Sequence, residues 1–271
     1  MKKIVLQLAA LLFVASVPSI NNSFAQTQID IGIKGGLSIP NLTSSSSNNA
    51  ISSGYSSRLD ADAAIHAEFH LAKRFSIQPQ LEYSSQGGKK NGTQAFTIPD
   101  EMRQQFPPGE APAFLYATYK SEARINYLML PVLAKYHFDL KKRWSAYAAA
   151  GPFVSFLLNA KNITKGSSYI YLDNAQTQPV SSQPQSFDSK DNIRGDLHRF
   201  NAGICGHLGM NYMLKKGSVF IEAGGNFGLI DIQKNEANGK NKTGAAVINI
   251  GYQFILQHVK LPVIPRKQQE N

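Results

Sequence analysis

The feature that most constrains this fold is a pair of long apolar runs at 124–138 and 144–159, joined by a short charged break. Side chains in the first run alternate with the two-residue period of a β-strand. A strand of about 14 residues is long for a soluble domain, where roughly five or six residues are usual. That length suits a tilted strand crossing a bilayer. The two runs therefore predict a membrane-spanning β-hairpin.

Further segments alternate in the same way, with Ile, Leu, Phe and Tyr on one face and charged or amide side chains on the other. These predicted strands lie at 28–40, 59–72, 75–84, 198–214, 219–230 and 243–256. The connections alternate between short turns and long polar segments, and the long segments lie at 41–57, 87–123, 160–197 and 231–242. Even-stranded membrane barrels have short periplasmic turns and long outer loops. The sequence predicts an all-β fold, an eight-stranded antiparallel up-and-down transmembrane β-barrel.

The alternative is a soluble periplasmic β-barrel that encloses a ligand, as lipocalins do. Such a barrel would have an apolar interior and a polar exterior. A continuous apolar face on nearly every predicted strand is instead the mark of a lipid-facing band. The membrane barrel is therefore the favoured interpretation.

Prolines interrupt this pattern. Pro79, Pro131 and Pro152 lie inside predicted strands, although proline cannot donate to a ladder and a closed barrel has no free edge. We expect a bulge or a skipped ladder bond at each of them. Prolines also make a continuous strand improbable in 87–123, where 98–105 has the pattern of a helical turn.

The N-terminus has the pattern of an export signal. Lys2 and Lys3 precede an apolar run, and Ala25 ends a small-x-small cleavage motif. We therefore predict a signal peptide at 1–25, a barrel at 26–256 and a polar tail at 257–271. The signal peptide would direct export and then be cleaved, and we predict that the protein resides in the outer membrane of a Gram-negative bacterium.

The charge distribution bears on partners. The formal net charge is +10, but the basic residues are scattered and form no stripe interleaved with aromatic residues. Nucleic acid is therefore not an expected partner, whereas outer-membrane lipid with anionic headgroups is. A single cysteine, Cys205, excludes an intrachain disulfide. We expect a monomer.

The inward face of the predicted barrel carries charged residues at comparable depth, and an eight-stranded barrel has room only for side chains in its lumen. Unpaired charges there would be costly, so we predict a mutually neutralising layer. The charged members are Lys34, Glu68, Lys135 and Glu222, and hydrogen bonds are expected from His66, His137, His207, Gln80 and Asn211. The alternative is a proton or ion path.

Catalytic and metal-binding patterns are weak. His66 and His70 are four residues apart on a strand, a separation of about 13 Å, so they cannot share a metal ion without a third element. We predict no metal and no cofactor. The apolar faces carry no Ser/His pairing, and no Gly-x-Ser-x-Gly elbow occurs. The expectation is a non-enzymatic protein, with an outer-membrane lipid-modifying enzyme as the alternative.

The longest loops, 87–123 and 160–197, exceed the length of ordinary connectors, and such loops are often functional. Both are rich in aromatic residues that could contact a protein partner or the membrane surface, or could pack on one another over the barrel mouth. These residues are Phe96, Phe106, Phe114, Tyr116, Tyr119, Tyr169, Tyr171 and Phe187. Contact with a partner or the membrane surface would imply a binding role, and packing over the barrel mouth would imply a structural one.

Several short motifs resemble one family. They are Gly-Ile-Lys-Gly-Gly-Leu-Ser at 32–38, Gln-Pro-Gln-Leu-Glu-Tyr at 78–83, Tyr-Leu-Met-Leu-Pro-Val-Leu-Ala-Lys-Tyr at 127–136, Ala-Gly-Pro at 150–152 and Asn-Ile-Gly-Tyr-Gln-Phe at 249–254. Together they resemble the outer-membrane β-barrel domain of PorT-like proteins, over about 28–256. The resemblance implies the barrel fold and a protein-secretion accessory role, and it identifies no catalytic residue.

Overall fold

The computed structural model describes residues 27–45, 50–104 and 106–259. The predicted signal peptide at 1–25 and residues 260–271 of the predicted tail lie outside this part of the chain. Within it, no helix is long and apolar enough to cross a membrane.

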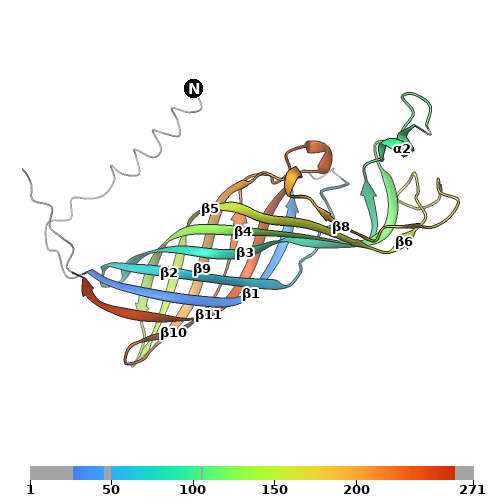
Figure 1. The fold of residues 1–271 in the computed structure, drawn as a ribbon. Coiled ribbons are helices and arrows are strands. Elements are labelled where there is room, and N and C mark those ends of the chain that lie inside the picture. Colours follow the sequence, from blue (N-terminus) through green and yellow to red (C-terminus); the bar gives the residue numbers. More distant parts are fainter. Residues whose placement is uncertain (1–26, 46–49, 105, 260–271) are drawn as a thin grey trace, which may run out of the picture.

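The chain forms a closed ring of eight antiparallel strands, so the predicted fold class is confirmed (Figure 1). Each strand pairs with the next along the ring, and the last pairs with the first. In order, the ring contains β1 (Thr27–Ser44), β2 (Asp60–Ala72), β3 (Phe75–Phe96), β4 (Leu115–Asp139), β5 (Trp144–Lys165), β9 (Phe200–Met213), β10 (Gly217–Gly228) and β11 (Asn241–Val259).

The outside of the ring is apolar and the inside is largely polar. Ile33 leaves 56% of its surface exposed, whereas the next residue, Lys34, leaves 5%. This alternation follows from the two-residue side-chain period of a strand. An apolar exterior is the reverse of what a soluble ligand-binding barrel requires, so that alternative is wrong.

Strands β3 and β4 continue far beyond the apolar band, which corrects the prediction of a loop throughout 87–123. Their ladder runs without a shift from Gly87↔Arg124 to Phe96↔Leu115. The alternating signal disappears there because neither face of the hairpin meets lipid. The true connection is 97–114, and it contains α2 (Asp100–Arg103) inside the predicted helical turn. Figure 1 shows this hairpin projecting past the ring.

The other long connections also contain more structure than predicted. In 160–197, β5 extends to Lys165 and pairs with β8 (Ser189–Asn192), while β6 (Ser167–Ser168) pairs with β7 (Gln185–Ser186). Short 3-10 turns form at η1 (Arg194–Asp196) and η2 (Glu236–Asn238). Strand β1 reaches Ser44, inside the loop predicted at 41–57, and β11 reaches Val259, inside the predicted tail.

The three prolines within the strands are accommodated by skipped pairs and not by bulges. At each one, two successive residue pairs are missing from one ladder, and the register is the same on both sides of the gap. The gaps lie between His66↔Gln80 and Phe69↔Ile77, between Pro79↔Val132 and Glu82↔Met129, and between Pro131↔Phe153 and Ala134↔Ala150.

The lumen contains apolar side chains as well as polar ones. Met129, Leu133 and Phe153 belong to one buried apolar cluster, and Ile125 and Tyr127 belong to another. Apolar groups fill the narrow interior without the desolvation cost that polar groups incur. The prediction of a polar lumen is therefore incomplete, because charged groups share the interior with these clusters.

Candidate functional site

The first charged group in the lumen is centred on Lys34 of β1. Its Nζ donates to Oε1 of Glu222 on β10 at 2.8 Å and lies 3.7 Å from Oε2 of Glu82 on β3. All three side chains are almost completely buried. Their inward positions follow from strand alternation, and a buried charge persists only when it is paired in this way.

The second charged group is centred on Glu68 of β2. Its Oε2 accepts hydrogen bonds from Nζ of Lys135 at 2.8 Å and from Nε2 of Gln253 at 3.0 Å. Lys135 also donates to Oε1 of Gln78 at 2.9 Å, and Gln253 also donates to Oδ2 of Asp30 at 2.8 Å. Strands from both ends of the sequence are thereby joined around one carboxylate.

Tyr147 of β5 connects the two groups. Its hydroxyl donates to Oε2 of Glu222 at 2.7 Å, and Nζ of Lys135 lies 4.0 Å from the centre of its ring. The predicted charged residues therefore form two ion pairs, Lys34 with Glu222 and Lys135 with Glu68, bridged by an aromatic ring.

The predicted hydrogen-bonding residues all lie inside the barrel, but only some of them have a polar partner there. His137 contacts Glu68 at 2.7 Å, and Asn211 donates to Ser145 at 3.4 Å. Nδ1 of His207 lies 3.7 Å from Glu222. Among the described residues, His66 and Gln80 have no side-chain hydrogen-bond partner; the ring of His66 packs edge-on against Phe220, with centroids 5.7 Å apart.

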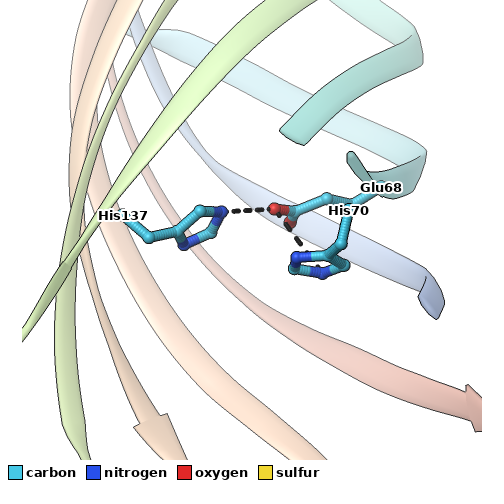
Figure 2. A group of neighbouring side chains, drawn as sticks. All are labelled: Glu68, His70 and His137. Carbon is cyan, nitrogen blue, oxygen red and sulfur yellow. Dashed lines mark hydrogen bonds and ion pairs between the residues drawn. The ribbon is translucent and has the colours of Figure 1, made fainter. Parts of the chain in front are cut away.

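Two imidazoles converge on Glu68 at the short-turn end of the barrel (Figure 2). Oε1 of Glu68 lies 2.7 Å from Nε2 of His137 on β4 and 3.9 Å from Nε2 of His70 on β2. Oδ2 of Asp30 lies 2.9 Å from the same His70 nitrogen. The side chains of His70 and His137 are 24% and 14% exposed, so this cluster is open to solvent while Glu68 is not.

A serine also touches this cluster, but it does not form a catalytic triad. The Ser76 hydroxyl lies 3.0 Å from Nε2 of His137 and donates to Oε1 of Glu68 at 2.5 Å. In a triad the serine and the carboxylate contact different imidazole nitrogens, so that the carboxylate orients the base. Here both contact the same nitrogen, so the imidazole is not oriented to remove the serine proton.

The opposite, long-loop end of the barrel has a cluster around the buried Arg58. Its guanidinium pairs with Asp60, donates to Oε1 of Glu122 at 3.0 Å and donates to Ser85 at 3.2 Å. Hydrogen bonding from the Arg124 guanidinium lowers the pKa of the Glu122 carboxyl. These contacts tie the segment before β2 to the extended parts of β3 and β4.

A cavity of about 280 Å³ lies under the long loops, with Tyr55, Lys90, Tyr119 and Leu197 in its wall. The Lys90 ammonium lies 4.3 Å from the centre of the Tyr55 ring and donates to the carbonyl of Ile51. Burial lowers the pKa of Lys90 to about 8 and raises that of Tyr55 to about 12. This cavity therefore combines aromatic walls with a poorly solvated amine.

The aromatic residues of the long loops are largely occupied with one another. Phe187 stacks on Tyr119 with centroids 4.6 Å apart and contacts Phe96 edge-on at 5.8 Å. Tyr116 and Tyr171 pair through their backbones. Tyr169 is 40% exposed. Phe106 and Phe114 are partly buried.

Sequence reasoning missed several members of these clusters, chiefly Asp30, Glu82, Tyr147 and Gln253. Alternation alone assigns each of them to the inward face, and that signal was available. What alternation lacks is the stagger between strands, which decides which inward residues meet. A search for metal ligands along one strand likewise misses His70 and His137, which come from β2 and β4.

Comparison with known proteins adds a family match. The model of a family described as the outer membrane protein beta-barrel domain matches residues 24–234. No curated protein matches the chain.

Solved outer-membrane barrels show a distant likeness. OprG from Pseudomonas aeruginosa is 12% identical with a TM-score of 0.38, over 85% of this chain and 98% of that one. Ail of Yersinia pestis is 12% identical with a TM-score of 0.33, over 83% and 98%. The outer membrane protease OmpT from Escherichia coli is 10% identical with a TM-score of 0.33, over 88% and 99%. Likenesses this distant carry no information about activity.

Proposed function

The chain belongs to the outer membrane protein β-barrel domain family, and on that premise we propose that it is a non-conducting, non-enzymatic barrel that binds a protein partner through 87–123 and 160–197. Family membership means that the protein resides in the outer membrane of a Gram-negative bacterium. Short turns of such barrels face the periplasm and long loops face the exterior. The proposed binding surface is therefore extracellular.

The observation that carries this proposal is the ordered extension outside the apolar band. The continued ladder of β3, β4 and β5 supports a small core of its own, in which Ile98, Leu115 and Ile170 are buried. A connector between two strands needs only a few residues. A paired and packed segment of this length beyond the apolar band has the properties of a rigid recognition surface.

The lumen supports the non-conducting part of the proposal. Lys34, Glu68 and Lys135 are at most 5% exposed, and the apolar clusters fill further depth of the barrel. An eight-stranded ring leaves space only for these side chains. The protein therefore works through its ends and not through a pore.

Photocrosslinking in whole cells tests the binding surface. A photoreactive residue in place of Tyr169 is expected to give a discrete adduct with one outer-membrane or extracellular protein, because this side chain is exposed at the extension. The matched control is the same residue at Lys142, in the exposed short turn at the other end. An adduct no stronger at Tyr169 than at Lys142 would contradict the proposal.

A loop deletion provides the second arm. Phe96 and Leu115 form the last pair of the β3–β4 ladder, so an Asn-Gly turn can replace 97–114 without changing the barrel. This variant is expected to retain the barrel and lose the Tyr169 adduct.

Purified protein is also expected to leave outer-membrane lipid chemically unchanged, and lipid turnover would reject the non-enzymatic assignment.

The motifs that resemble PorT-like barrels favour one class of partner, a component of a protein-secretion assembly. In that case, deletion of the gene would retain secreted cargo in the cell, and the variant lacking 97–114 would not restore secretion. Normal secretion in the deletion strain would exclude a secretion component as the partner, but it would not contradict the proposed binding surface.

A further inference from the structure

The cluster at the periplasmic mouth has the composition and shape of a transition-metal site. We propose that Glu68, His70 and His137, with Asp30 as a further ligand, bind a divalent ion of the Zn²⁺ type at this end of the barrel. This proposal replaces the expectation of no metal, which considered histidines along a single strand. It is independent of the extracellular binding surface, because it concerns the other end of the molecule.

The donor atoms are already close to a coordination geometry. One ligand atom from each of Glu68, His70 and His137 lies within 4.8 Å of the others. Tetrahedral zinc with bonds of about 2.0–2.1 Å places neighbouring donors roughly 3.3 Å apart. The distances from Oε1 of Glu68 to the two Nε2 atoms are 2.7 Å and 3.9 Å, on either side of that value. Each of these two distances would change by about 0.6 Å on binding, and the imidazole nitrogens, which lie within 4.8 Å of each other, would also move closer together.

The remaining polar contacts orient the carboxylate for this role. Lys135 and Gln253 both bond to Oε2 of Glu68, which leaves Oε1 facing the imidazoles and the Ser76 hydroxyl. A bound ion would replace the hydrogen bond from Ser76 to Oε1. Outer-shell hydrogen bonds of this kind fix first-shell ligands in known metal sites. Asp30, which is held by the same Gln253, presents Oδ2 at 2.9 Å from Nε2 of His70. Two carboxylates then offset the charge of the ion beside the Lys135 ammonium.

Access and ligand chemistry favour the same ion class. His70 and His137 are partly exposed, so an ion can enter from the periplasm without crossing the filled lumen. Imidazole together with carboxylate suits zinc and its neighbours, whereas Mg²⁺ and Ca²⁺ prefer oxygen ligands alone. A bound ion would tie β1, β2 and β4 together at the barrel rim.

The test is direct metal binding by the untagged mature barrel in detergent, after removal of metal with a chelator. Calorimetric titration with Zn²⁺ is expected to show one ion per chain, and Co²⁺ is expected to give the visible absorption of a tetrahedral site. His70→Ala and His137→Ala should each weaken binding by more than the ~10–100-fold that loss of an outer-shell partner costs. His198→Ala, at an exposed histidine before β9, is the matched control and should bind as the wild type does.

Folding of every variant is checked by its heat-modifiable mobility on electrophoresis. His70→Gln is a second variant that keeps a polar side chain at this partly exposed position and still removes the ligand. Absence of stoichiometric Zn²⁺ binding by the wild type would overturn the proposal. Wild-type affinity in the folded His70→Gln or His137→Ala barrel would overturn it as well.

Discussion

The buried ion pair of Lys34 and Glu222 contributes to the free energy of unfolding of the barrel. Their side chains are within 2.8 Å and are almost completely buried. Removing one partner leaves an uncompensated charge, which costs about 3–5 kcal/mol. Lys34→Met is therefore expected to lower the free energy of unfolding by that amount, measured by urea titration in phospholipid vesicles.

The control for this variant is Lys89→Met, because Lys89 is exposed on the extension. Exposed substitutions usually change stability by less than about 0.5 kcal/mol. Equal unfolding midpoints for Lys34→Met and Lys89→Met would contradict the buried ion pair.

Lys90 provides a residue-scale prediction about pH. It lies beyond the apolar band, and burial lowers its pKa from an ordinary 10.5 to about 8. The unfolded chain then binds the proton more tightly than the folded chain. Folding is therefore favoured increasingly as pH rises from about 8 toward 10.5, where the unfolded lysine also loses its proton. NMR titration of the Lys90 side chain is expected to show a midpoint near 8, and a midpoint above 10 would contradict the buried position.

At the residue scale, the sequence predicts which face a side chain occupies but not its partner. Alternation places Lys34, Glu68 and Lys135 inside the barrel, because strand geometry leaves no other choice. The pairing of Lys34 with Glu222 joins β1 to β10, which are not neighbours in the ring. Such contacts across the lumen depend on the stagger of the closed barrel, and no local pattern encodes it.

The β3–β4 extension is the element on which the proposed binding surface depends, and Gly87 lies at its base. Gly87 has a φ of +120°, and a Cβ there would lie 2.0 Å from the carbonyl oxygen of Ala123. Gly87→Ala is therefore expected to disorder the extension while leaving the transmembrane ring intact. Limited proteolysis should show new cleavage within 85–125, because locally unfolded backbone is the substrate of proteases.

Gly195→Ala is the matched control for that experiment. Gly195 has an ordinary backbone conformation and nothing within 4 Å of its would-be Cβ. This variant should resist protease as the wild type does. Protection of Gly87→Ala equal to that of Gly195→Ala would show that the base of the extension tolerates a side chain.

At the element scale, strand ends inside the apolar band are predictable and strand ends outside it are not. β2 and β5 begin within one residue of the predicted positions, because lipid-facing and lumen-facing residues alternate there. The outer halves of β3 and β4 pair Lys89 with Glu122 and Lys90 with Ser121. Polar pairs of this kind have no hydrophobic period, so they cannot be distinguished from a loop by pattern alone.

For the whole molecule, the order of short and long connections was enough to predict the ring. Each short turn joins antiparallel neighbours, and an even number of strands brings both ends of the ring to the periplasmic side. The observed closure of β11 on β1 agrees with that topology. Packing of the long-loop aromatic residues on one another was one of the alternatives that the sequence left open. Which residues meet was not predictable, since contacts such as that of Tyr119 with Phe187 join distant segments.

We propose that this barrel, whose lumen is filled by side chains, works through its ends. Electrical recording of the purified protein in a planar lipid bilayer tests this claim most directly, with an open porin as the positive control. Insertion without stepwise conductance is the predicted result, because buried ion pairs and apolar clusters occupy the interior. Reproducible conductance steps from the wild-type protein would contradict a filled lumen and would favour the alternative of an ion path through the barrel.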